Sequence, residues 1–105
     1  MAVPVYSHNF FGIKGLSGAF SYTVPAGFTA VIRSVDAYNS STFTTNLFLH
    51  GSAGEAIWWA RNNFPGGSFY ASFRGRVIIN ELSTFDVTTD AEWDVNVNGY
   101  LLTLP

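Results

Sequence analysis

The stretch EWDVNVNGYLLTL, residues 92–104, carries the clearest fold signal in the chain. Trp93, Val95 and Val97 alternate there with polar residues. Because successive side chains of a strand point to opposite faces, this alternation predicts a strand with one buried and one solvated face. From Gly99 onward the apolar residues fall on the other phase, so we expect a β-bulge at Gly99. A two-residue hairpin turn at the same place would leave only a short final strand, which favours the bulge.

The rest of the chain is typical of short β-strands separated by turns. β-branched and aromatic residues dominate, and turn residues such as Pro25-Ala26-Gly27 recur at short intervals. We therefore expect an all-β, antiparallel β-sandwich or barrel. Phe28–Tyr38 has two partly apolar faces, which predicts a central strand or a strand covered on its far side by a neighbour. The apolar run Val77-Ile78-Ile79 also predicts a central position in the sheet. The expected strands are Val3–Ser7, Gly18–Val24, Phe28–Tyr38, Thr44–His50, Ala56–Arg61, Ser68–Phe73, Arg76–Asn80, Phe85–Thr88 and Glu92–Leu104.

The segment Phe10–Phe20 combines large apolar residues with three glycines. Glycine weakens the interior of both helices and strands, so we expect an extended apolar arm. Such an arm must lie against the chain's own body or against a neighbouring copy. We therefore divide the chain into an N-terminal extended arm, residues 1–17, and a β-sandwich domain, residues 18–105.

The composition excludes several classes of protein. Only 11% of the 105 residues are charged, whereas about 25% is usual in globular proteins. The absence of cysteine excludes disulfide scaffolds, thiolate metal sites and cysteine nucleophiles. A net charge of -2 with five basic residues argues against nucleic-acid binding, and no apolar run predicts a membrane span or a signal peptide. So few charges, with 17% aromatic residues, predict that part of the surface is buried in an assembly.

Two groups of residues could in principle hold a metal ion. Asp90, Glu92 and Asp94 share one face of an expected strand, which is a spacing that calcium ligands can have. Without an Asp-x-Asp-x-Asp-Gly loop, a solvated strand face is the favoured interpretation. His8 and His50 lie in different segments, where we expect polar ends of strands. We therefore predict no cofactor and no metal.

Two serines lie between glycines, in Gly15-Leu16-Ser17-Gly18 and in Gly51-Ser52-Ala53-Gly54. Neither stretch matches the Gly-x-Ser-x-Gly elbow, and neither lies between a strand and a helix. Nucleophilic catalysis also needs a base and an orienting acid, which the sequence does not place nearby. We therefore predict that the chain is not an enzyme and has no catalytic residue.

Arg74-Gly75-Arg76 is the densest positive charge in the chain. Two residues apart on a strand, both arginines point the same way, which favours a shared anionic partner. Glu55, Glu81 and Asp86 could supply it from adjacent strands. A carboxylate of another subunit is the alternative.

The aromatic residues supply the remaining binding candidates. Trp58 and Trp59 are adjacent, so one should point into the core and the other outward or into an interface. The outward ring, together with Trp93, could instead stack on a sugar. Phe64 lies in a loop that also looks exposed. The predicted interface residues are Phe10, Phe11, Trp58, Trp59, Phe64, Arg74 and Arg76.

Residues 22–35, YTVPAGFTAVIRSV, resemble the opening of small tailed-bacteriophage virion proteins. The turn at Asn39-Ser40-Ser41 and the closing strand from Val95 to Leu102 extend the resemblance to roughly residues 21–104. It implies a jelly-roll-like antiparallel β-sandwich that works as an oligomeric structural subunit. The turn at residues 80–83, Asn-Glu-Leu-Ser, departs from the Pro-Gly-Asp/Glu that is usual there. The resemblance concerns the scaffold, so no functional residue is carried over.

These observations together predict a bacteriophage virion structural protein, specifically a capsid decoration protein that stabilises the head. Its expected partners are further copies of itself, as a homo-oligomer taken to be a trimer, and the phage major capsid protein or tail proteins. We expect no nucleic acid and no membrane as partners, and a location in the virion after assembly in the host cytoplasm. The alternatives are a tail-tip or collar component, and a carbohydrate-binding module that uses Trp58 or Trp59 with Trp93.

Overall fold

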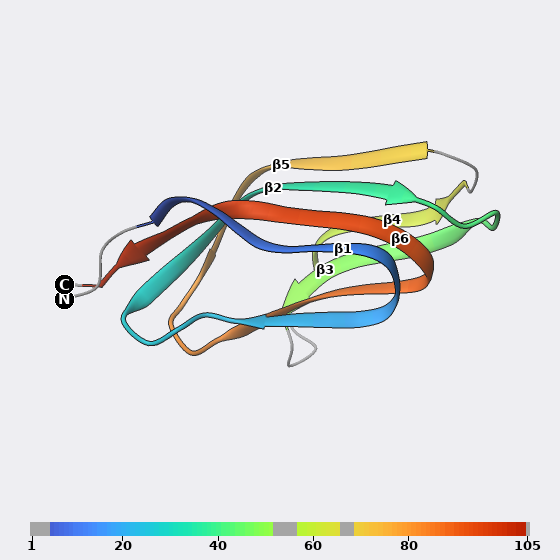
Figure 1. Cartoon of the computed structure of the whole chain (residues 1–105). Helices are drawn as coiled ribbons and strands as arrows, with labels where there is room; N and C mark the ends of the chain where they lie inside the picture. Colours follow the sequence, from blue (N-terminus) through green and yellow to red (C-terminus); the bar gives the residue numbers. More distant parts are fainter. Residues whose placement is uncertain (1–4, 52–56, 66–68, 105) are drawn as a thin grey trace.

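The computed structural model describes residues 5–51, 57–65 and 69–104, and these form an all-β antiparallel sheet without helices. The sheet curls into a nearly closed barrel shape (Figure 1). Its strands, within the described residues, are β1 (Val5–Thr23), β2 (Phe28–Asn39), β3 (Thr45–Gly51), β4 (Ile57–Phe64), β5 (Phe69–Ile79) and β6 (Thr84–Thr103). The expected strands are thus present, but several of them are joined into the long strands β1, β5 and β6.

The sheet is built around β6. The strand order is β4-β3-β6-β2-β5, and β1 pairs with β6 from Val5 to Thr23. Residues 85–89 of β6 pair with β3, whereas residues 93–103 pair with β2. Figure 1 shows β1 and β6 bending together between these halves, so that the sheet folds over on itself. In β1 the bend falls where the register shifts and where Gly15 and Gly18 have φ of 73° and 111°.

The core lies between the folded halves of the sheet. The predicted alternation in β6 is confirmed, since Trp93, Val95 and Val97 are fully buried. The indole N–H of Trp93 donates a hydrogen bond of 2.9 Å to the hydroxyl of Thr45, so the largest core side chain also has its polar atom satisfied. The other buried apolar residues of β6 are Phe85, Val87 and Leu101.

The bulge predicted at Gly99 is wrong. Inward-facing residues of β6 continue at every second position through Gly99 to Leu101, while Leu102 is 38% exposed. The extra residue lies instead in the partner strand β2, where the register shifts between Ile32 and Ser34. A Cβ at Gly99 would collide with the backbone carbonyl of Val31, so the glycine gives this stretch of β2 its space.

β2 is a central strand, as predicted, because it lies between β5 and β6. The prediction of a central position for Val77-Ile78-Ile79 is wrong. These residues end β5, which is the last strand of the order, and Ile78 is 62% exposed. Three consecutive apolar residues can lie at a sheet edge when the middle one points away from the core.

The apolar segment near the N-terminus lies against the chain's own body. Phe10, Phe11 and Leu16 are buried, and the ring of Phe10 meets that of Phe85 edge to face with centroids 5.8 Å apart. The sequence left open whether this segment packs against its own chain or against a neighbouring copy, and in the structure it packs against its own chain. β1 crosses the boundary between residues 17 and 18 at which the sequence divided arm from domain, and residues 1–4 lie outside the described residues.

Candidate functional site

The outward face of the sheet carries polar and aromatic side chains in register across β6, β2 and β5. Asp36 on β2 lies between Asn96 on β6 and Ser72 on β5. Tyr38, two residues further on, is paired in the same way with Asp94 and Tyr70. The alternation that buries Val35 and Ala37 therefore also sets these side chains on one solvated surface.

Two depressions indent this surface. One has a volume of about 260 Å³ and is lined by Asp36, Ala37, Tyr38, Tyr70, Asp94 and Asn96. The other, of about 390 Å³, is lined by Gly12, Ile13, Lys14, Asp94 and Asn96. Because both are lined by Asp94 and Asn96, the two depressions lie side by side across four strands, and we call them together the outer-face trough.

Side chains in the trough are held by hydrogen bonds. The amide of Asn9 donates to the side-chain oxygens of Asn98 at 2.7 Å and of Asn96 at 3.4 Å. The backbone N–H of Gly15 donates to one carboxylate oxygen of Asp94 at 2.8 Å. A Cβ at Gly12 would lie 2.5 Å from the side-chain oxygen of Asn96, so the glycine leaves room for that amide.

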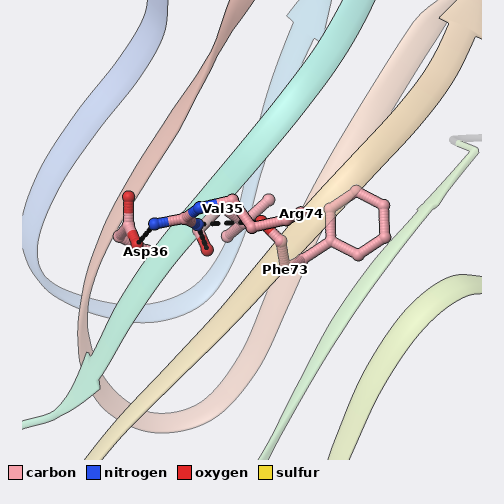
Figure 2. A network of polar contacts seen from close by, with 4 residues as sticks. All are labelled: Val35, Asp36, Phe73 and Arg74. Carbon is pink, nitrogen blue, oxygen red and sulfur yellow. Dashed lines mark hydrogen bonds and ion pairs between the residues drawn. The ribbon is translucent and has the colours of Figure 1, made fainter.

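Asp36, at the other side of the trough, is fixed by Arg74 (Figure 2). The guanidinium donates to the Asp36 carboxylate at 2.7 Å and to the carbonyl of Phe73 at 2.9 Å. The two side chains are 62% and 49% exposed, so the pair adds little to stability and serves mainly to orient the carboxylate. Arg74 thus pairs with Asp36 and, among the residues that the structure describes, with neither Glu81 nor Asp86. Arg76 is exposed and forms no ion pair within the described residues.

The acids that the sequence offered to these arginines are used elsewhere or are not described. Glu81 accepts the backbone N–H of Gly27 at 2.8 Å, and Asp86 accepts the hydroxyl of Ser21. Glu55 lies outside the described residues.

The aromatic interface candidates do not form one surface. Phe10 and Phe11 are 6% exposed, so the interface role expected for them is corrected to a core role, because β1 pairs with β6 and turns both rings inward. Trp58, Trp59 and Phe64 are half-buried and pack against the core. Both tryptophans reach the core rather than one of them standing free.

The tryptophans do not form the sugar platform that the sequence offered as an alternative. Trp93 is completely buried, and Phe64 covers it with ring centroids 5.3 Å apart. The ring of Trp59 lies 6.0 Å from that of Phe73 and bridges β4 to β5. A sugar could not reach Trp93 without opening the core.

The sequence indicated Asn39 as a turn residue, but its side chain is buried and joins two strand ends by hydrogen bonds. The amide donates to the carbonyls of Phe43, Phe64 and Pro65 at 3.1–3.3 Å, and its oxygen accepts both the N–H and the hydroxyl of Ser41. It ties the end of β2 to the end of β4. No sequence pattern signals this role, because the partners are carbonyls from a distant segment.

The metal candidates do not converge. Within residues 5–51, 57–65 and 69–104, no three His, Asp or Glu residues lie close enough together to hold an ion. Both ring nitrogens of His50 lie 2.8 Å from oxygens, of Gly51 and Thr88, and the side chain of His8 is outside the described residues. Asp90 accepts the backbone and side-chain N–H groups of Asn46, and chiefly the backbone bond lowers its pKa below the usual value.

The structure describes the two serine stretches only in part. Ser17 lines a depression of about 420 Å³ with residues 40–43, Ala91 and Glu92, and Ser52 lies outside the described residues. Burial raises the pKa of Tyr22, whose ring packs against Phe10 and Phe85. In the part of the chain that the structure describes, no helix has the length and hydropathy to cross a membrane.

No model of a known protein family matches the chain, and no curated protein matches it either. The resemblance to small tailed-phage virion proteins therefore rests on the quoted residues. Their structural place is clear: residues 25–27 turn the chain from β1 into β2, where Gly27 has φ of 86° and the N–H of Phe28 bonds to the carbonyl of Pro25.

Proposed function

We propose that this chain is a structural subunit of a bacteriophage virion, an oligomeric capsid decoration protein that binds the major capsid protein. Its action is mechanical, because it stiffens the shell by burying apolar surface between neighbouring subunits. Two kinds of support lead to this proposal, the pairing of the strands and the apolar residues that the monomer leaves in solvent.

The strand pairing supports a jelly-roll β-sandwich. Divided at their bends, β1 and β6 give one row of segments, residues 5–16, residues 93–103, β2 and β5. The other row consists of residues 18–23, residues 84–89, β3 and β4. Two such antiparallel rows, with the chain passing back and forth between them, are the arrangement of jelly rolls, which viral capsid proteins often use.

The backbone conformation and the exposure of Leu82 are the main support for the proposal. It has φ of 64°, a left-handed backbone conformation that costs a leucine energy, and its side chain is 66% exposed. Its turn is fixed, since the N–H of Leu82 donates to the carbonyl of Val24 and the N–H of Val24 donates to that of Ser83. The turn therefore holds a leucine at the cost of backbone strain and of an apolar side chain in water. Contact between this side chain and a partner would account for both costs.

Other apolar side chains lie around this turn. Ile78 and Trp58 line a depression of about 120 Å³ to which Asn80 and Ser83 of the turn also contribute. We call Trp58, Ile78 and Leu82 the apolar margin. Trp58 and Ile78 lie on β4 and β5, the two ends of the strand order, and Leu82 lies in the turn that follows β5. Arg76, on β5 and exposed, offers a charge beside the margin for an acid of the partner.

The area available fits an oligomer. A stable interface removes about 800 Å² from each partner. Two such faces, as in a trimer, would cover more than a quarter of the 5737 Å² of accessible surface. That burial compensates for a composition with only 11% charged residues, which solvates a free surface poorly.

The test uses virions of the bacteriophage whose genome encodes this chain. Mass spectrometry of purified particles is expected to detect the chain at hundreds of copies, in a fixed ratio to the major capsid protein. A few or a dozen copies would support the tail-tip or collar alternative. Absence of the chain from the particles would overturn the proposal.

A further inference from the structure

We propose that the outer-face trough binds a neutral carbohydrate. The trough lies on β1, β6, β2 and β5, whereas the margin proposed for assembly follows β4, β5 and the turn after β5. The inference goes beyond the proposed function, because a glycan could occupy the trough whether or not the chain is part of a virion.

An exposed aromatic pair forms one end of the trough. The side chain of Tyr70 is 78% exposed, and its ring centroid lies 4.9 Å from that of Tyr38 at an angle of 51°. A tyrosine has few rotatable bonds, so it offers a flat apolar face at a low cost in entropy. The C–H face of a sugar ring is flat and weakly apolar, and it matches such a surface.

Polar groups already held in place lie beside this pair. Arg74 fixes one oxygen of Asp36, and the N–H of Gly15 fixes one oxygen of Asp94. Among the described residues no hydrogen bond reaches the second oxygen of either carboxylate, so each could accept one from a sugar hydroxyl. Because these groups are already oriented, binding would cost less ordering than on a flexible surface.

The amide of Asn96 completes the polar set between the two carboxylates. Its oxygen accepts from Asn9 at 3.4 Å, and Gly12 opposite has no Cβ that would displace it. Amides both donate and accept, as sugar hydroxyls do. Aromatic faces beside fixed carboxylates and an amide are the mixture that a polyhydroxylated ring requires.

The charges that line the trough suit a neutral ligand. Asp36 and Asp94 both face it, and Arg74 is paired with Asp36. Lys14 lies at the far end with Gly12 and Ile13 and balances the charge of Asp94. The trough therefore gives an anionic glycan or a nucleic acid no net electrostatic attraction.

Binding of neutral oligosaccharides by the full chain tests the inference. A panel of gluco-, manno-, galacto- and N-acetylglucosamine oligosaccharides is titrated by NMR and calorimetry up to millimolar concentration, with sialylated and sulfated glycans in parallel. Tyr70→Ala and Asn96→Ala are expected to weaken binding by about tenfold or more. Phe43→Ala is the matched control, because Phe43 is 69% exposed but lies outside the trough, and it should bind like the original chain.

The outcomes separate this inference from the proposed function. Saturable binding of a neutral glycan that Tyr70→Ala and Asn96→Ala weaken, with shifts of the Tyr38 and Asp94 resonances, supports it. Lack of binding to every neutral glycan overturns it, as does binding that the Phe43 variant loses equally, or a preference for the anionic glycans. Oligomeric state and presence in virions do not change with any of these results.

Discussion

Two regions of the sheet differ in how their strands meet. β1 and β6 are paired along what we call the seam, whereas among the described residues β4 and β5 meet without pairing at the margin. Along the seam the strands pair from Val5 to Thr23, and the rings of Phe10 and Phe11 are buried behind them. At the margin no strand ladder joins β4 to β5 within the described residues, and Ile78 and Leu82 stay exposed. The seam therefore stabilises the fold, and the margin is the surface that we propose for association.

Removing one side of the seam should have the largest effect. Deletion of residues 1–17 takes away Phe10, Phe11 and Leu16, all buried. Losing a single buried phenylalanine side chain costs about 3–5 kcal/mol, and a domain has only about 5–15 kcal/mol in total. We expect the truncated chain not to fold, although the sequence analysis assigned residues 18–105 to a domain separate from the arm. Circular dichroism with thermal melting checks this, and a cooperative transition would show that the seam is dispensable.

A charge in the middle of the seam should come next. Val97 on β6 is completely buried, so Val97→Asp places an unpaired carboxylate in the core. The cost is several kcal/mol, of the order of 3–5 kcal/mol, and should unfold most of the protein. Leu102→Asp is the control, since Leu102 lies on the same strand with its side chain 38% exposed. Equal urea midpoints for the two variants would contradict the assigned faces of β6.

Gly99→Ala should have an intermediate effect. The new methyl group would collide with the carbonyl of Val31, so β2 must shift, at a cost of about 1–3 kcal/mol. Gly75→Ala is a useful comparison, because its Cβ would meet only the ring of Phe73, which can move. If the Gly99 variant were as stable as the original chain in urea unfolding, β2 and β6 would not approach each other as closely as described.

The smallest expected effect concerns Asp90, near the bend of β6. Hydrogen bonds from Asn46 lower the pKa of this carboxyl in the folded chain. The stability it contributes is therefore present above its unfolded pKa, about 3.9, and is lost as the pH falls through the folded value. Asp90→Asn should make unfolding less dependent on pH between about 5 and 2. An unchanged slope of stability against pH would exclude this contribution.

The sequence predicted the strands better than their pairing. Alternation in residues 92–98 identified the buried face of β6, and apolar residues on both faces marked β2 as central. The bulge was misplaced, because the glycine at position 99 is required by the close approach of the β2 backbone. The sequence of β6 alone gives no information on that approach. The edge position of Ile78 was missed for the same reason, since strand order depends on partners that are distant in sequence.

The candidate site was predictable only in part. Arg74 stood out as a charge, but its partner Asp36 became visible only through the register of β2 and β5. The trough itself was not foreseen, because its residues are scattered over four strands. Cross-strand neighbours of this kind are set by pairing, and a single sequence does not record pairing.

The oligomeric state of the purified chain and of a Leu82→Gly variant tests the central claim most directly. Glycine accepts the left-handed φ of 64° without strain but has no apolar side chain to offer a partner. We expect a defined oligomer, a trimer, for the original chain by multi-angle light scattering at about 50 µM. We expect Leu82→Gly to be a folded monomer, whose melting temperature no longer rises with protein concentration. An original chain that stays monomeric, or a glycine variant that still assembles, would contradict the proposed association through Leu82.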